Sequence, residues 1–347
     1  MVMDRGKNKM EGFSRYLKEY LEYNNISQTE FANRLGISQK HMNELLNGKM
    51  SITLERAAQI YRLTNIPIEF IINAENRKYV TGYLLKKYGN EKKLQEVIKK
   101  DFYMNELEKR EWVEFKDKTN WVQNYMDLLD FLKVTNLEAL NKVQEKTLFK
   151  KSGENINKLS LWIARCDELS KEQSVKEYIP VSFPFLIQDL KEEAYKDFSI
   201  ESIQKILNNY GIYFVVEKAL SGTKVRGCFK VKAKKPAIYI TKNYSSKDSF
   251  FFELFHELGH CKSDYNEAKN KVIVEGSEKQ EQRADNFALN TMIDVDNWSQ
   301  IQNNYDEENL LKVSKQNRIP MSFIVGRLAM IKKIKYSSNL YNKYKNV

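Results

Sequence analysis

Apolar residues near the start of the chain recur at the three- and four-residue spacing of short helices. Residues 28–35 and 39–46 each carry one apolar face and an otherwise polar surface. The apolar positions are Phe31, Ala32 and Leu35 in the first segment and Met42, Leu45 and Leu46 in the second. Two further helices are expected around Ile60 and Ile71, so residues 1–75 are predicted to form a small helical domain.

Capping and turn residues separate these helices. Ser27 is a natural N-cap, and Glu30 three residues later completes the pattern of a capping box. Gly36 permits the left-handed backbone that ends a helix, and Ser38 caps the next one. The sequence therefore predicts two short helices joined by a tight turn, which is the pattern of a helix-turn-helix.

The hydrophobic pattern changes along the rest of the chain. Residues 76–160 are expected to be helical, with many charged and aromatic side chains. Strand-like runs follow in the stretch before residue 245, and helical spacing returns from residue 246 onward. The expected strands are Ile212–Val216, Val225–Val231 and Ala237–Thr241.

These elements predict a mainly α protein with a small β-sheet, of the α+β class. A length of 347 residues suits two or three domains. The expected parts are a five-helix helix-turn-helix domain at 1–75, a helical connector at 76–160 and a C-terminal domain at 161–347.

The charge of the chain is uneven. It has 57 Lys and Arg residues against 46 Asp and Glu residues, a net charge of +11 that suggests a nucleic-acid partner. The first 75 residues carry only +1, whereas residues 76–245 carry +9. We therefore expect a single copy of the N-terminal domain to hold DNA weakly, since phosphate contacts supply much of the affinity.

Other features exclude several protein classes. No apolar run is long enough to cross a membrane, and the first ten residues lack the apolar segment of a secretory signal peptide. Three scattered cysteines form no CxxC pair, which argues against a disulfide framework and a thiolate zinc site. We expect a cytoplasmic protein with no membrane partner.

The outward face of residues 39–46 carries side chains of the types that reach base edges in a major groove. These side chains are Gln39, Lys40, Asn43 and Glu44. An alternative is a plain helical bundle that uses the same apolar pattern only for packing. The segment SQTEFANRLGISQKHMNELLNGK resembles the DNA-binding domain of Xre/Cro-type repressors, over about residues 12–73.

The resemblance implies particular contacts with double-stranded DNA. Bases would face Gln39, Lys40 and Glu44, and phosphates would be contacted by Gln28, Asn47 and Lys49. Because one copy carries little positive charge, we expect a homodimer that binds a palindromic operator. His41 is expected to be an ordinary surface or partly packed residue and not a metal ligand, and a base or phosphate contact is the alternative.

The strongest chemical signal is an H-E-x-x-H motif in the apolar segment FFFELFHELGH. His256 and His260 are four residues apart, so one helical face presents both imidazoles to one point. Imidazole nitrogens placed in this way are typical ligands of zinc. Glu257 follows the first histidine, where it can act as general base for water attack on a peptide carbonyl, with zinc as Lewis acid.

A third ligand has to be a carboxylate, because the remaining histidine is the distant His41. The following helix, with the sequence EKQEQRADNFAL, places Glu281 and Asp285 four residues apart on one face. One of them can bind the metal while the other accepts the outer N–H of a ligating histidine. On spacing alone, Glu275 and Glu278 compete for the ligand role.

These segments resemble the ImmA/IrrE-type zinc metallopeptidase domain. The similarity rests on FFFELFHELGH, on ExxADNFA and on the strand-rich VRGCFKVKAKKPAIYIT before them. It implies a gluzincin-like site in which His256, His260 and Glu281 hold Zn2+, Asp285 supports a ligand and Glu257 is catalytic. It also places the chain among regulators of phage, mobile-element, stress-response or antitoxin type.

Two classes of function stay open. The first is a DNA-binding transcriptional regulator with a zinc-dependent endopeptidase domain that cleaves a regulatory protein or the chain itself. The second is a non-catalytic repressor or antitoxin whose zinc domain is structural, sensory or partner-binding. The protein partner would be a substrate, a repressor or a toxin. No oxyanion stabiliser is evident, and Tyr265 and Arg283 are only candidates for that role.

Lysines crowd one predicted strand and turn. Lys230 and Lys232 alternate along the strand, so their side chains share one face. A site for DNA or an acidic peptide is one interpretation. The interpretation we expect is a solvated hairpin edge, which the charges protect against aggregation.

Overall fold

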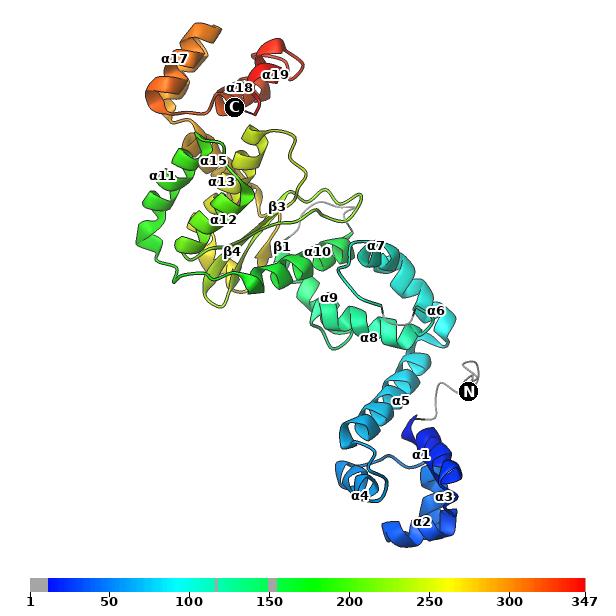
Figure 1. Ribbon diagram of the computed structural model, residues 1–347. Coiled ribbons are helices and arrows are strands. Elements are labelled where there is room, and N and C mark those ends of the chain that lie inside the picture. Colours follow the sequence, from blue (N-terminus) through cyan, green and yellow to red (C-terminus); the bar gives the residue numbers. More distant parts are fainter. Residues whose placement is uncertain (1–11, 116–117, 149–154, 347) are drawn as a thin grey trace. The chain divides into compact units, whose positions relative to one another are not determined.

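The computed structural model describes residues 12–115, 118–148 and 155–346 (Figure 1). This part of the chain is mainly helical and contains one five-stranded sheet, which confirms the predicted α+β class. The first eleven residues, and with them the start that lacks a signal-peptide pattern, lie outside it, as do residues 149–154 of the predicted connector. None of the described helices is both long enough and apolar enough to cross a membrane.

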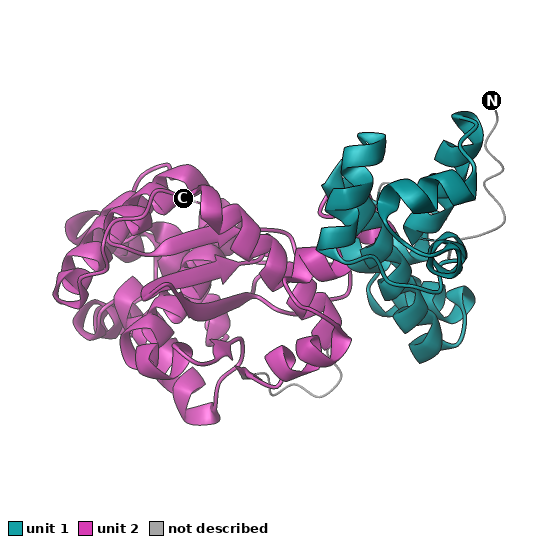
Figure 2. Ribbon diagram, turned by 90° about the horizontal axis from the view of Figure 1, so that it is seen from below, with its two compact units in different colours: residues 1–104, 114–127 teal, residues 105–113, 128–347 magenta. Residues whose placement is uncertain are grey.

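The chain forms two compact units, which Figure 2 distinguishes by colour. The first comprises residues 1–104 and 114–127, and the second comprises residues 105–113 and 128–347. The backbone therefore passes from one unit to the other after Met104, Val113 and Asp127. The three-part division predicted at residues 75 and 160 stays a prediction.

Helices make up the described part of the first unit. They are α1 (Gly12–Tyr23), α2 (Gln28–Leu35), α3 (Gln39–Leu46), α4 (Leu54–Thr64), α5 (Ile68–Tyr88), α6 (Glu91–Glu96), the π-helical turn η1 (Val97–Asp101) and the first part of α8 (Trp121–Leu132). The apolar faces of α1 to α5 meet in one buried core, which includes Phe13, Phe31, Met42 and Ile71. These contacts explain the helical spacing of apolar residues in this stretch.

The predicted helix ends of the helix-turn-helix are present. Ser27 Oγ accepts a hydrogen bond from the Glu30 N–H at 3.1 Å, and Ser38 Oγ accepts one from the His41 N–H at 3.2 Å. Gly36 ends α2 with a φ of 69°, in the left-handed region. The predicted capping box is only half formed, because the Glu30 carboxylate pairs with Arg34 one helical turn later.

Helices also surround the sheet of the second unit. They are α7 (Met104–Lys109), α9 (Leu137–Gln144), α10 (Ile156–Leu169), η2 (Ser170–Glu172), η3 (Pro180–Ser182), α11 (Phe183–Ala194), α12 (Ile200–Asn209), α13 (Lys247–Ser263), α14 (Tyr265–Ala268), α15 (Glu278–Met292), α16 (Val295–Asn303), α17 (Glu307–Asn317), α18 (Met321–Met330) and α19 (Asn339–Tyr344). The connector residues Asn105–Val113 belong to this unit, so it is assembled from two separate segments of the chain.

The sheet has the strand order β1-β5-β3-β4-β2. Its strands are β1 (Thr147–Leu148), β2 (Tyr213–Val216), β3 (Gly227–Lys232), β4 (Lys235–Ile240) and β5 (Val272–Ile273). The β3–β4 and β3–β5 pairs are antiparallel, and the β2–β4 and β1–β5 pairs are parallel. Three strands match the predicted runs to within a few residues, whereas β1 and β5 were not predicted.

The interpretation of the lysine-rich strand as a solvated edge is wrong. β3 lies between β5 and β4, so it is an interior strand of the sheet. Lys230 Nζ binds both carboxylate oxygens of Asp167 on α10, at 2.9 and 2.8 Å, and Lys232 Nζ donates to Ser170 Oγ at 2.6 Å. The two lysines therefore fix α10 and η2 against one face of β3.

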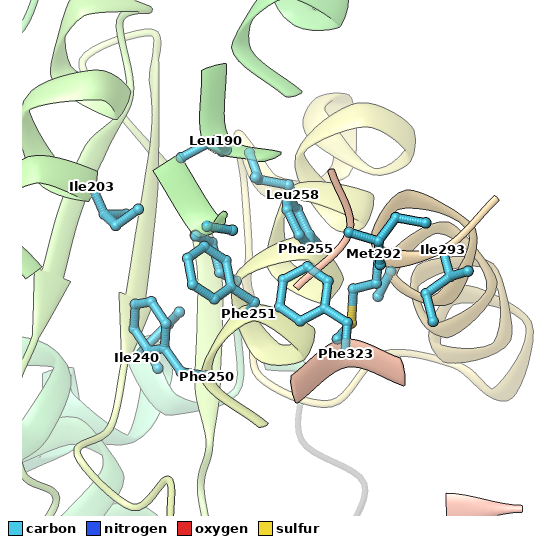
Figure 3. Close-up of a cluster of buried hydrophobic side chains, with 14 of the residues drawn as sticks. Leu190, Ile203, Ile240, Phe250, Phe251, Phe255, Leu258, Met292, Ile293 and Phe323 are labelled. Atoms are coloured by element: carbon cyan, nitrogen blue, oxygen red, sulfur yellow. The ribbon is translucent and has the colours of Figure 1, made fainter. Parts of the chain in front are cut away.

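The opposite face of β3 packs against α13, since successive residues of a strand point to opposite faces. Phe229 belongs to the same buried cluster as Phe250, Phe251 and Phe255 of α13. Figure 3 shows these phenylalanines of α13 together with Met292 of α15 and Phe323 of α18. The apolar residues around the H-E-x-x-H motif thus place α13 in the centre of the second unit.

Candidate metal centre

α13 and α15 approach each other closely where the H-E-x-x-H motif lies. A Cβ added to Gly259 would lie 2.9 Å from Ala284 Cα, so only a glycine allows this approach. α15 begins with a capping box in which Ser277 Oγ accepts from the Gln280 N–H and the Ser277 N–H donates to Gln280 Oε1. Its first turn therefore carries Glu281 to the histidines of α13.

The structure brings His256, His260 and Glu281 together. The two Nε2 atoms are 3.1 Å apart, and Glu281 lies 3.4 Å from each, through Oε2 to His256 and Oε1 to His260. All three ligand atoms lie within 4.8 Å of one another. Two imidazole nitrogens and one carboxylate oxygen form a donor set that suits zinc with one position left for a water or substrate.

Other acidic residues proposed as ligands lie elsewhere. Glu275 lines the cleft in front of the histidines, and Glu278 is exposed on α15.

The Glu281 carboxylate is oriented by a backbone hydrogen bond, which the Gly276 N–H donates to Oε1 at 2.6 Å. Burial by itself would raise the pKa of Glu281, but hydrogen bonds from both histidines and from Gly276 hold it well below its ordinary value. Glu281 is therefore an ionised donor.

The outer nitrogen of each histidine has a carboxylate partner. His256 Nδ1 lies 2.8 Å from Asp285 Oδ1, and His260 Nδ1 lies 2.8 Å from Asp264 Oδ2. Each carboxylate can accept the Nδ1 proton and leave Nε2 as a donor for a metal. Asp285 occupies the supporting position named from the sequence. Asp264 was missed, although its position four residues after His260 was a readable signal.

Both candidate oxyanion stabilisers have other partners. Arg283 Nη2 donates to Asp264 Oδ1 at 2.6 Å, so it supports the carboxylate behind His260. The Tyr265 hydroxyl donates to the Lys234 carbonyl at 2.6 Å. The structure therefore places neither group in the cleft wall.

A positive charge is favoured where the three donors meet. Burial lowers the pKa of His256, but hydrogen bonds to Asp285 and Glu281, together with nearby Glu257 and Glu253, raise it to about 11. A divalent cation at this point would meet the same surrounding carboxylates. The electrostatic environment therefore fits a metal ion.

Glu257 is buried beside these groups. Glu257 is only 2% exposed, and its Oε2 has no hydrogen-bond partner among the described residues. Desolvation raises the pKa of Glu257 well above its ordinary value. A Cβ on Gly227, the first residue of β3, would overlap Glu257 Oε1, so the glycine makes room for this carboxylate. An orphaned carboxylate oxygen of this kind suits a proton acceptor.

A polar cleft of about 660 Å³ opens in front of His256. Its lining residues are Lys224, Val225, Arg226, Gly227, Asn243, Phe252, Glu253, His256, Val274, Glu275, Glu281 and Asp285. Glu253 was not predicted to take part. It lies one helical turn before Glu257, and burial raises its pKa. The cleft is thus lined by two residues of the candidate metal centre, His256 and Glu281, and by the acidic residues near them.

The residues predicted to contact DNA lie on the surface of α2, α3 and the turn after α3. Gln28, Gln39, Lys40, Asn43, Asn47 and Lys49 are exposed, and Glu44 is half-buried. Gln39 donates to the Thr29 hydroxyl, and Asn47 Nδ2 donates to Asn43 Oδ1 at 2.7 Å. His41 is exposed, as expected.

Comparison with known proteins identifies the first part of the chain. A helix-turn-helix family model matches residues 17–71, from the middle of α1 into α5. The predicted helix-turn-helix is confirmed, and with it a role in DNA-binding transcription regulation with double-stranded DNA as partner. No curated protein matches the chain.

Proposed function

We propose that this DNA-binding regulator carries a zinc-dependent endopeptidase in its second unit. The observation that supports the proposal most is the meeting of His256, His260 and Glu281, two of which line the cleft, with the orphaned carboxylate of Glu257 nearby. The set is gluzincin-like, and it is similar to the ImmA/IrrE-type metallopeptidase. The substrate would be a regulatory protein or the chain itself.

In such a site, some residues of this chain would bind the metal and others would orient the residues that bind it. His256, His260 and Glu281 would hold Zn2+, while Asp285 and Asp264 keep the imidazoles oriented through their Nδ1 atoms. When bound, zinc would polarise a peptide carbonyl and lower the pKa of a water molecule.

Glu257 is suited to the proton transfer that peptide hydrolysis requires. Its Oε2, which has no hydrogen-bond partner among the described residues, would take a proton from the attacking water and later return it to the leaving amine. The cleft wall that begins at Lys224 would hold the substrate backbone near this group.

A second candidate function rests on the same burial of Glu257. Because the carboxylate is only 2% exposed and does not line the cleft, a substrate has little direct access to it. In that case the chain is a non-catalytic repressor or antitoxin, and its metal centre is structural, sensory or partner-binding. The N-terminal helix-turn-helix would act in the same way in both cases.

Substitution of Glu257 separates the two functions. Cells that produce wild-type chain, Glu257→Gln or the exposed control Glu278→Gln are compared by mass spectrometry of new protein N-termini. The peptidase predicts cleavage products with wild type and Glu278→Gln, none with Glu257→Gln, and equal zinc content in all three. Products that persist in Glu257→Gln, or zinc-loaded wild type without products, would favour the second candidate.

We also propose that the chain binds a palindromic operator as a homodimer. The support is the charge of only +1 on the first 75 residues, which gives a single copy few phosphate contacts. Light scattering of the chain with operator DNA tests this, and tight binding by a monomer would contradict it.

A further inference from the structure

One wall of the metal cleft is an irregular segment of the second unit. Residues 217–226, here called the wall loop, lead from the end of β2 to the start of β3. Their last three residues, Lys224 to Arg226, line the cleft together with Gly227. Gly227 in turn lies against Glu257, so the end of the wall loop sets the space around that carboxylate.

The short helix α7 holds the backbone of the wall loop. Arg110, directly after α7, donates to the Lys218 carbonyl at 2.6 Å and to the Ala219 carbonyl at 3.0 Å. Glu106 Oε1 accepts from the Ser221 N–H and from its hydroxyl, both at 2.9 Å. Arg110 and Glu106 also pair with each other at 2.6 Å. We call this set of contacts the α7 clamp.

α10 holds the same loop from a second side. Trp162 Nε1 donates to the Glu217 carbonyl at 2.9 Å, and Lys158 Nζ donates to the Ser221 carbonyl at 2.5 Å. With the α7 clamp, side chains satisfy backbone groups of the wall loop that no strand pairing satisfies. The position of the loop therefore depends on these side chains.

The α7 clamp lies far from the cleft in sequence. Residues 105–113 belong to the second unit, whereas the segments on both sides of them, up to residue 104 and from 114 to 127, belong to the first. A part of the predicted connector thus takes part in building the cleft. The side chains of Glu106 and Arg110 are only 21% and 18% exposed, so the ion pair between them is partly buried.

We propose that Glu106 and Arg110 are positioning residues that hold the wall of the metal cleft in place for substrate. The effect on cleavage rests on the proposed peptidase function, whereas the effect on the loop does not. Without the clamp, the wall loop samples other positions, and the cleft holds an extended substrate less well. The metal donors on α13 and α15 are unaffected.

Hydrogen exchange of the full-length, zinc-loaded chain tests the clamp. Glu106→Ala removes the acceptor for Ser221, whereas Glu106→Gln keeps an acceptor oxygen at the same place. Lys109→Ala, at an exposed position of α7, is the matched control. We expect Glu106→Ala to raise amide exchange in residues 217–227 by about tenfold, with near wild-type exchange in the other two variants. Exchange of residues 247–263 and the zinc content stay unchanged.

Two results would overturn the proposal: wild-type exchange of the wall loop in Glu106→Ala, or a rise spread evenly over the second unit. Once a cleaved protein is known, Glu106→Ala should raise KM several-fold with a smaller change in kcat, and Glu106→Gln should restore it. An unchanged KM would contradict the substrate role. A loosened loop in a chain whose wild type cleaves nothing would refute the peptidase and leave the clamp standing.

Discussion

Two aspartates decide which nitrogen of each histidine faces the candidate metal centre. Asp264 and Asp285 each lie 2.8 Å from an Nδ1 atom, but their surroundings differ. The Asp264 side chain is 5% exposed and is held by Arg283, whereas the Asp285 side chain is 50% exposed. A hydrogen bond that is shielded from water is the stronger orienting contact.

Asp264→Asn should therefore weaken zinc binding more than Asp285→Asn. We expect a loss of about 10- to 100-fold in affinity for the first, which is the usual range for a carboxylate behind a ligating histidine. Competition with a chromophoric chelator at neutral pH measures the difference. Asp296→Asn, at an exposed position of α16, is the control. Equal affinities in all three variants would show that neither aspartate orients a ligand.

Contacts between residues of one helix could be predicted from the sequence, whereas contacts between residues of different elements could not. Spacing places His256 with His260 and Glu281 with Asp285, because four residues make about one helical turn. Whether Glu281 or Glu275 lies beside the histidines depends on how closely α13 and α15 approach each other. Gly259 permits the close approach because it has no Cβ. No periodicity encodes such a contact.

Two glycines of the first unit both have room for a Cβ atom, but their backbone conformations differ. Apart from the neighbouring backbone, a Cβ added to Gly36 or to Gly82 would meet no described atom within 4 Å. Gly36 has a φ of 69° at the end of α2, whereas Gly82 lies inside α5. An alanine is therefore strained at the first position and favourable at the second.

Gly36→Ala should lower the free energy of unfolding of the first unit by about 1 kcal/mol, because a left-handed backbone disfavours a Cβ. Gly82→Ala should raise it by about 0.5–1 kcal/mol, because it reduces the backbone freedom of the unfolded chain. Urea unfolding followed by circular dichroism compares the two with wild type. Shifts of the same sign would contradict the assigned helix end.

Elements with local signals were predictable, and elements that depend on pairing were not. The bounds of α2 and α3 follow from Ser27, Gly36 and Ser38, which act on neighbouring backbone groups. β1 and β5 have two residues each, and pairing with other strands is what makes them strands. The order of strands is likewise absent from the pattern, and for this reason the lysines of β3 were misplaced at an edge.

The charge of the whole molecule lies mainly outside its DNA-binding surface. The first 75 residues carry +1 of a total of +11. Acidic residues nearly balance the basic ones there, and the cation expected to contact a phosphate is the exposed Lys49. Affinity for DNA should depend on Lys49, and on salt.

Lys49→Ala should weaken DNA binding about uniformly across sequences and reduce the slope of log K against log salt by about 1 for each copy bound. Gln39→Ala should weaken operator binding with little change in that slope, because it removes a base contact. Fluorescence anisotropy over a salt series measures both. Lys315→Ala, exposed on α17 of the second unit, is the control. A slope that Lys49→Ala leaves unchanged would rule out the phosphate contact.

We propose that this DNA-binding chain also holds a metal ion between α13 and α15. Elemental analysis of the purified full-length chain tests it most directly. We predict about one zinc ion per chain in wild type and in Glu257→Gln, and loss of zinc in His256→Ala, His260→Ala and Glu281→Ala. A folded wild-type chain that takes up no zinc would show that these residues form no zinc site, and a Glu281→Ala variant that holds zinc as tightly as wild type would show that Glu281 is not a ligand.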